Sequence, residues 1–177
     1  MSKLILIFLA CLGVANAATD YAKLSPVTNF QANEYLGSWY EVARIPFYWE
    51  RNCIAPITAN YSLNATNNAI LIVKNTCNTV SGKSDIANGE ALFVSESSIG
   101  HLKVGFAPSF RLGLGIGYGD YQVIDTDYTT YSLVGSENRK YLWILSRNNK
   151  LDANTFDRLV NKAKSLGFEV SGLIINN

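Results

Sequence analysis

Apolar and polar residues alternate along a series of short segments that occupies most of this chain of 177 residues. Alternate residues of a β-strand share one face, so such segments are typical of strands that bury one side. Polar turns separate them, as in the stretch 64–68, which is rich in asparagine. Eight strands are predicted, at 39–45, 57–63, 70–77, 89–94, 102–106, 121–125, 128–135 and 141–147. Their short and regular spacing predicts an all-β sandwich or barrel.

One later segment has the periodicity of a helix instead. Asp152 can cap its first turn, and Gly167 can end it. Its apolar residues fall on a single stripe, which consists of Phe156, Leu159, Val160, Ala163 and Leu166. A lone amphipathic helix after eight strands is expected to lay this stripe on the outside of the sheet. The chain shows no internal repeat or linker, so residues 18–177 are expected to form a single domain.

The first 17 residues have the organisation of a secretion signal. Lys3 supplies a charged start, residues 4–14 an apolar run, and residues 15–17 a cleavage site of the small-x-small kind. The run is shorter than the about 20 residues that a membrane-spanning helix needs. An alternative is a lipoprotein signal with Cys11 lipidated, but the apolar run continues beyond Cys11. We therefore expect cleavage after Ala17 and a secreted or periplasmic protein.

Composition and charge argue against several classes of function. Apolar residues make up 48% of the chain, and 15 basic residues nearly balance 14 acidic ones, so no basic face for nucleic acid is expected. The chain has one histidine, His101, and no His or Cys cluster with metal-ligand spacing, so neither a metal nor a cofactor is expected. It also lacks the Gly-x-Ser-x-Gly motif of hydrolases. We do not expect an enzyme.

Removal of the signal leaves two cysteines, Cys53 and Cys77. An even count in an exported protein suggests a disulfide, and the alternative is two free thiols. A bond between them would close a loop of about 25 residues and stabilise the fold by roughly 3.5 kcal/mol in the chain-entropy model. Asn60 and Asn64 each begin a glycosylation sequon, which matters only in a eukaryotic secretory pathway.

An up-and-down order of the eight strands would bring distant segments together. If Trp39 starts the first strand at the bottom, residues 126–128 and Arg147 also lie at the bottom, and Arg147 can stack on the indole. The same order puts Cys53 and Cys77 at the top rim. It also sends two loops to the top, at 45–49 and 110–119.

These bottom residues carry a family resemblance. Three parts of the chain resemble the three signature regions of the lipocalins, in family order and spacing. They are Gly37-Ser38-Trp39-Tyr40, Thr126-Asp127-Tyr128 with Tyr131, and Arg147. Residues 35–44 and 141–147 resemble the branch of the bacterial lipocalins and apolipoprotein D, and so does the pairing of Cys53 with Cys77. The departure is the segment 110–119, which is longer and richer in glycine than that branch usually shows.

The resemblance implies an eight-stranded antiparallel barrel whose cavity holds one small ligand. Members of this branch resemble carriers of fatty acids, lysophospholipids and similar amphiphiles, which would serve lipid transport or membrane maintenance. Two alternatives are an enzyme acting on a bound lipid, with Cys53 unpaired as nucleophile, and an interaction module. The second would use the mouth aromatics Phe47, Tyr48 and Trp49, which could also touch a lipid surface.

Alternation then predicts which residues line the cavity. Trp39 and Arg147 fix the inward phase of the first and last strands, and an apolar interior fixes the phase of the others. The candidate ligand-binding residues are Glu41, Ala43, Ala91, Phe93, Leu102, Val104, Phe106, Tyr121, Val123, Trp143 and Leu145. Tyr121 is expected to hydrogen-bond a polar ligand head near the rim. The competing interpretation is that these side chains simply fill the barrel.

Overall fold

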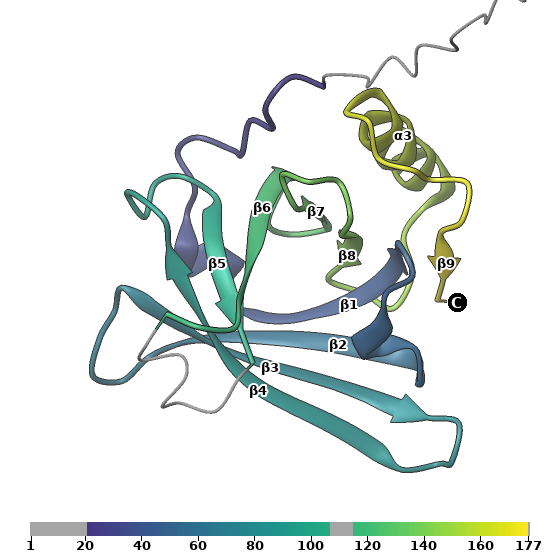
Figure 1. Ribbon diagram of the computed structural model, residues 1–177, viewed down its shortest axis with the longest axis horizontal. Coiled ribbons are helices and arrows are strands. Elements are labelled where there is room, and N and C mark those ends of the chain that lie inside the picture. Colours follow the sequence, from purple (N-terminus) through teal and green to yellow (C-terminus); the bar gives the residue numbers. More distant parts are fainter. Residues whose placement is uncertain (1–20, 107–114, 177) are drawn as a thin grey trace, which may run out of the picture.

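The computed structural model describes residues 21–106 and 115–176 (Figure 1). The predicted signal with Cys11 lies outside these ranges, and so does the first half of the segment 110–119. The barrel strands are β1 (Gly37–Arg44), β2 (Cys53–Leu63), β3 (Ile70–Thr79), β4 (Ser84–Phe93), β5 (His101–Gly105), β6 (Tyr118–Thr126), β7 (Tyr131–Gly135) and β8 (Leu142–Ser146). The remaining elements are α1 (Ala32–Tyr35), η1 (Tyr48–Glu50), α3 (Ala153–Ser165) and β9 (Ile174–Ile175).

The eight long strands form one closed antiparallel barrel. Each strand pairs with its sequence neighbour from β2 to β8, and β1 then pairs with both β8 and β2 to close the sheet. The predicted up-and-down barrel is therefore confirmed. The short strand β9 is an addition that pairs with the upper half of β1. Among the described residues, no helix is both long and apolar enough to cross a membrane.

Several strand boundaries differ from the prediction, and for two of them the structure gives a physical reason. Strand β4 begins at Ser84 rather than at residue 89, because its hairpin with β3 extends past the body of the barrel. Both faces of that extension are exposed, so its sequence lacks the alternation of apolar and polar residues that would predict a strand. Strand β7 begins at Tyr131 because the carboxylate of Asp127 accepts three successive backbone N–H groups and holds residues 127–130 in a turn.

Trp39 and Arg147 meet at the closed end of the barrel, as predicted. Trp39 is fully buried, and the guanidinium carbon of Arg147 lies 3.7 Å from the centre of its ring. The indole N–H donates to the carbonyl of Tyr35 in α1 at 2.9 Å. Arg147 also donates to four backbone carbonyls, those of Glu34, Leu36, Ser38 and Tyr128. One side chain thus ties α1, the start of β1 and the turn before β7 together.

Gly37 has a conformational reason to be glycine. Its φ of +90° is a value that residues with a side chain rarely adopt. A Cβ atom there would also lie 3.5 Å from the guanidinium of Arg147. The contact at 3.5 Å is an ordinary one, so the positive φ, with which the chain turns into β1, is what requires glycine.

Helix α3 packs on the outside of the barrel, as predicted (Figure 1). Leu159 and Ala163 are fully buried against an outer cluster that includes Leu133 and Ile144. Asp152 caps the helix through the N–H of Thr155 at 2.9 Å. The outer face of the sheet thus has its own core, separate from the interior of the barrel.

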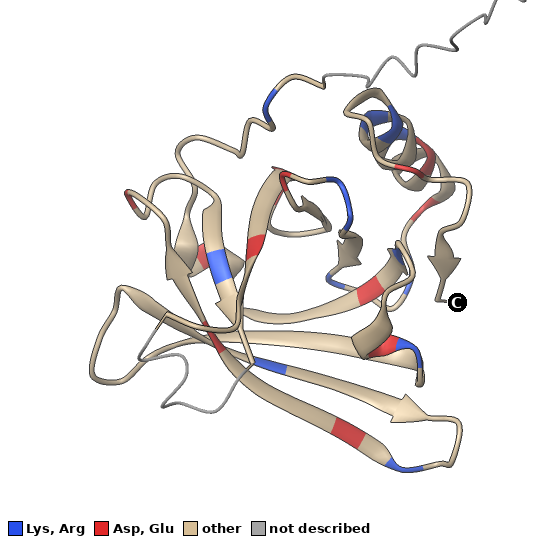
Figure 2. Cartoon of the chain, viewed as in Figure 1, with Lys and Arg blue, Asp and Glu red and all other residues tan. Residues whose placement is uncertain are grey.

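Charged groups fasten α3 to β6. Lys162 and Arg158 both reach the carboxylate of Asp125, at 2.8 Å and 3.2 Å. Burial alone would raise the pKa of Asp125, but the hydrogen bonds and charges of its basic partners outweigh burial and hold that pKa below its usual range. Figure 2 shows acidic and basic positions interspersed over the helix and the barrel.

Cys53 and Cys77 form a disulfide at the opposite end from Trp39, as predicted. Cys53 begins β2 and Cys77 lies near the end of β3, and the two Cα atoms are 5.5 Å apart. The bond joins neighbouring strands across the irregular stretch of β2, where the pairing register shifts between Ile54 and Thr58. It therefore supports the part of the wall where the backbone ladder is weakest.

We expect Arg147→Ala to lower the free energy of unfolding by about 2 kcal/mol, because four carbonyls lose a charged donor and Trp39 loses its stacked cation. Chemical denaturation followed by tryptophan fluorescence measures this change. Arg51→Ala is the matched control, since Arg51 stacks at the same 3.7 Å over exposed Tyr48 and donates to one carbonyl. Equal effects of the two substitutions would contradict a special role for the closed end.

Candidate functional site: the barrel interior

The pairing register defines the inner face of the barrel, because partners in an antiparallel pair point to the same side. Most predicted cavity residues share one interior cluster with Trp39, namely Ala91, Phe93, Leu102, Val104, Tyr121, Val123, Trp143 and Leu145. Glu41 pairs with Leu145 and so faces the interior as well. Phe106 is 41% exposed and lies against Gly89. The inward placement of the cluster is confirmed, and ligand binding by it stays a prediction.

The inward placement of Ala43 is wrong. A β-bulge between Glu41 and Ala43 inserts Val42 as an extra residue, so Ala43 pairs with Ile144 and joins the outer cluster under α3. The same bulge turns Arg44 inward, opposite Trp143. Regular alternation from Trp39 reverses at this point, because the bulge shifts the phase of the strand by one residue.

Four hydroxyl groups form a buried chain at the floor of the interior. The Tyr121 hydroxyl lies 2.8 Å from that of Tyr61 and 3.0 Å from that of Tyr35, and Tyr35 lies 3.0 Å from Ser132 Oγ. Tyr35 belongs to α1, next to Trp39. The expectation that Tyr121 serves the rim is therefore wrong, since its hydroxyl reaches down to the closed end.

These phenols stay neutral under physiological conditions. Burial raises the pKa of Tyr35 to about 12, although hydrogen bonds from Ser132 and Tyr121 and the charge of Arg147 oppose the rise. Burial also raises the pKa of Tyr61 and of Tyr121 well above the ordinary value. Tyr35 adds to both shifts, whereas the hydrogen bond with Tyr121 opposes the rise at Tyr61. The floor is thus polar in hydrogen bonding but unfavourable for negative charge.

Above this floor, several inward residues are partly exposed. The four hydroxyl-bearing residues of the floor are buried or nearly so, whereas Ala59, Gly89, Val104 and Trp143 retain partial exposure although they point away from the outer surface. Small side chains stand at several of these positions. The inward positions between the tyrosine floor and Trp143 are therefore less completely covered than the hydroxyl groups of the floor.

The aromatic loop at the mouth divides into two parts. Phe47 packs edge-on against both Trp143 and Tyr141, with ring centres 5.5 Å apart in each case. Tyr48 and Trp49, in η1, are 63% and 79% exposed. Phe47 thus extends the interior aromatic wall to the rim, while the other two rings face solvent.

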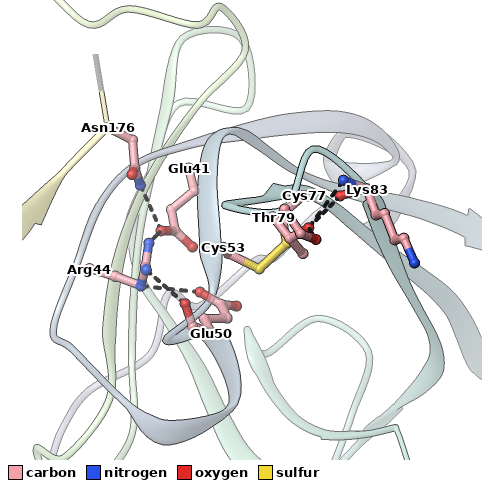
Figure 3. Close-up of a disulfide and its surroundings, with 9 residues drawn as sticks. Glu41, Arg44, Glu50, Cys53, Cys77, Thr79, Lys83 and Asn176 are labelled. Atoms are coloured by element: carbon pink, nitrogen blue, oxygen red, sulfur yellow. Dashed lines mark hydrogen bonds and ion pairs between the residues drawn. A yellow bond between two sulfur atoms is a disulfide. The ribbon is translucent and has the colours of Figure 1, made fainter.

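A buried ionic cluster closes the gap between the upper halves of β1 and β2 (Figure 3). Arg44 donates to the carboxylate of Glu41 at 2.5 Å and to the carbonyl of Glu50 at 3.1 Å. Asn176, just beyond β9, donates to the same Glu41 carboxylate at 2.8 Å. The cluster therefore joins the barrel wall, the mouth turn η1 and the C-terminal segment.

Glu50 shares one cation with a second carboxylate. Burial is the main cause that raises its pKa to about 9, the charge of Glu41 raises it further, and Arg44 only partly offsets them. The distances also indicate that Arg44 pairs with Glu41 rather than with Glu50, because Arg44 lies 2.5 Å from Glu41 but 3.4 Å from Glu50. We therefore assign the charge pair to Arg44 and Glu41, with Glu50 neutral near pH 7.

Sequence reasoning missed Arg44, Glu50, Tyr35 and Tyr61 as interior residues. The spacing of Glu41 and Arg44 by three residues signals opposite faces in a regular strand, so only the bulge brings them together. No signal in the sequence marks that bulge. The one histidine also has a partner, since His101 Nε2 lies 2.7 Å from Asp120. In the described part of the chain, no group of three or more His, Cys, Asp or Glu could hold a metal ion.

Comparisons with known proteins agree with this geometry. The family model described as a lipocalin-like domain matches residues 30–177. The chain is 34% identical over 166 residues to the outer membrane lipoprotein Blc of Vibrio cholerae, covering 93% of this chain and 88% of that protein. It is 33% identical over 160 residues to apolipoprotein D of Macaca fascicularis, covering 84% and 77%. Insecticyanin of the tobacco hornworm Manduca sexta has a similar fold, with a TM-score of 0.68 at 19% identity over 89% of this chain and 85% of that chain.

We expect the stability of the protein to fall as the pH rises from 6 towards 9, because folded Glu50 holds a proton that the unfolded chain has released. The stability that this proton provides is complete below the ordinary Glu pKa and is lost as the pH passes the folded pKa of about 9. The expected slope is up to roughly 1 kcal/mol per pH unit, measured by denaturant unfolding at several pH values.

Glu50→Gln should flatten this slope, since the amide keeps the shape of the neutral acid but does not titrate. Glu96→Gln, at an exposed position in the turn between β4 and β5, should leave the slope unchanged. A wild-type stability that is constant over this range would show that Glu50 is ionised in the folded protein.

Proposed function

Because this chain belongs to the lipocalin family, we propose that it is an extracytoplasmic carrier that holds a fatty acid, a lysophospholipid or a similar small apolar ligand in its barrel. The observation that carries the proposal is the partly exposed inner face between the tyrosine floor and Trp143. Lipid transport or membrane maintenance is the role that such a carrier would serve.

The chemistry of the inner face supports an apolar ligand with one polar end. Val104 and Trp143 offer apolar surface along the wall, and Phe47 continues it to the mouth. An acyl chain that buries about eight methylenes would gain roughly 6 kcal/mol. After the cost of association, this corresponds to micromolar binding.

The mouth suits the polar end of such a ligand. Tyr48 and Trp49 are exposed there, and these rings combine an apolar body with a polar edge. A lipid headgroup at this end would remain hydrated while its chain enters the barrel. The same two rings could make peripheral contact with a membrane during loading.

We expect a fluorescent fatty-acid probe to bind the delipidated protein with micromolar affinity, and Trp143→Ala to weaken binding by about tenfold. The substitution removes a large apolar surface from the centre of the aromatic wall, and a lost contact of about 1.4 kcal/mol corresponds to that factor. Fluorescence titration measures both affinities.

Phe168→Ala is the matched control, because Phe168 is a buried aromatic residue of the outer cluster under α3. It should reduce stability without changing affinity for the probe. Absence of detectable binding to the wild-type protein would remove the proposal, and equal losses in both variants would remove the assignment of the site to the interior.

The enzyme alternative needs a nucleophile or an acid-base pair inside the barrel, and an unpaired Cys53 would have supplied the nucleophile. That sulfur is bonded to Cys77, so the described residues contain no unpaired cysteine to act as a nucleophile. Titration of the native protein with a thiol reagent tests this point. A reactive Cys53 would revive the alternative of chemistry on a bound lipid.

Export is part of the proposal, and two forms of it differ at the N-terminus. Cleavage after Ala17 would give a soluble secreted or periplasmic protein, whereas lipidation of Cys11 would give a membrane-anchored one. The name of the Vibrio cholerae relative, an outer membrane lipoprotein, favours an extracytoplasmic location and keeps the second form open.

We expect the mature protein to begin at Ala18, because the apolar run of the signal extends past Cys11. Intact-mass spectrometry of the exported protein measures this directly. A mass that corresponds to a chain starting at Cys11 with attached acyl groups would show that the protein is a lipoprotein, and the carrier would then work at a membrane surface.

A further inference from the structure

We infer that the barrel takes a ligand whose buried part carries a hydroxyl group, and that Tyr61 donates a hydrogen bond to it. The inference rests on the proposed function and narrows its ligand class. A chain with an oxygen at its deep end would fit, in contrast to a plain acyl chain that ends in a methyl group. The reasons lie in the polar groups that the floor and wall leave without partners.

The hydroxyl chain has one donor too many. Tyr61, Tyr121, Tyr35 and Ser132 contribute four O–H groups but form only three hydrogen bonds with one another in a linear sequence. Within residues 21–106 and 115–176, the two terminal hydroxyls have no other partner. One O–H at one end is therefore left without an acceptor, and a buried donor without a partner is unfavourable.

Tyr61 is the end that faces the open part of the interior. Ser132 is fully buried, and the pKa of its neighbour Tyr35 is influenced by Arg147 and Tyr128 at the closed end. Tyr61 instead lies on β2, whose inner face continues through Ala59 toward the mouth. Its neighbour on the same strand toward the mouth is Ala59, a small inward residue that is partly exposed.

A second group of the opposite kind lies on the same wall. Asn75 is on the inner face of β3, two residues from Val73, and its neighbours across the sheet are Ala59 and Ala87. Its Oδ1 atom is buried and has no hydrogen-bond partner in the described part of the chain. A hydroxyl group both accepts and donates, so it suits a wall that presents the spare donor of Tyr61 and the spare acceptor of Asn75.

The buried oxygen should also be neutral. The floor that holds Tyr35, Tyr61 and Tyr121 disfavours negative charge. Arg147 lies on Trp39 with its donors bound to backbone carbonyls, and Arg44 is already paired with Glu41. A carboxylate would therefore stay at the mouth. The ligand we infer has its charged or bulky head outward and a hydroxyl on its buried chain.

The test compares saturated fatty acids of increasing length with their ω-hydroxy derivatives, by displacement of a fluorescent fatty-acid probe from the full-length protein. At the length that brings the hydroxyl to Tyr61, the wild-type protein should bind the hydroxy acid at least as tightly as the plain acid. A buried hydroxyl with no partner, or one that displaces bound water without gain, should instead weaken binding by about tenfold.

Tyr61→Phe should weaken binding of the hydroxy acid by about tenfold, while binding of the plain acid stays unchanged or becomes slightly tighter. Tyr40→Phe is the matched control, because Tyr40 lies between Trp39 and Glu41 on β1 and so faces outward. Ser132→Ala should keep the preference, since three hydroxyls still end at Tyr61. Thermal unfolding confirms that each variant is folded.

Rejection of every hydroxy acid by a wild-type protein that binds the plain acids would overturn this inference and leave the carrier function standing. If Ser132→Ala no longer binds the hydroxy acid as tightly as the plain acid, but Tyr61→Phe still does, the assignment of the hydrogen-bond donor to Tyr61 is wrong. If neither the plain acids nor the hydroxy acids bind, the result would instead count against the proposed function itself. If Tyr61→Phe does not fold, the wild-type comparison alone decides between acceptance and rejection of the hydroxyl.

Discussion

The stack of Arg147 on Trp39 is the interaction on which the rest of the fold depends. It joins residues more than a hundred positions apart, and the four carbonyls that Arg147 binds come from α1, the start of β1 and the turn before β7. Closing one end in this way leaves the other end free to open. The barrel can therefore combine a rigid base with a partly exposed interior.

The bulge in β1 has the largest effect on the chemistry of the interior. It allows the lower half of β1 to pair with β2 and the upper half with β9, and it turns Arg44 into the gap between β1 and β2. Arg44 then requires carboxylate partners, because an unpaired buried cation is costly. Glu41 and Glu50 supply them, and the mouth turn η1 is thereby attached to the wall.

The interior is thus layered in polarity. Neutral hydroxyls lie at the base, apolar and aromatic residues line the middle, and an ionic cluster sits in the wall near the mouth. A ligand with an apolar chain and an oxygen at each end matches this order better than a purely hydrocarbon one. The aromatic rings of Phe47 and Trp143 connect the middle layer to the rim.

The sequence by itself determined the barrel, the outer helix and the closed end, because apolar alternation, helical periodicity and the three signature regions are local patterns. The even number of cysteines predicted the disulfide, but only the structure decided between it and two free thiols. It also placed residues such as Leu102, Val104 and Trp143 on the inner face. It did not reveal the outward turn of Ala43 or the inward turn of Arg44, since a bulge leaves alternation intact on either side and only shifts its phase. Tyr121 likewise needed tertiary contacts for its role, because the partners of its hydroxyl come from α1 and β2, and only the closed barrel brings them together.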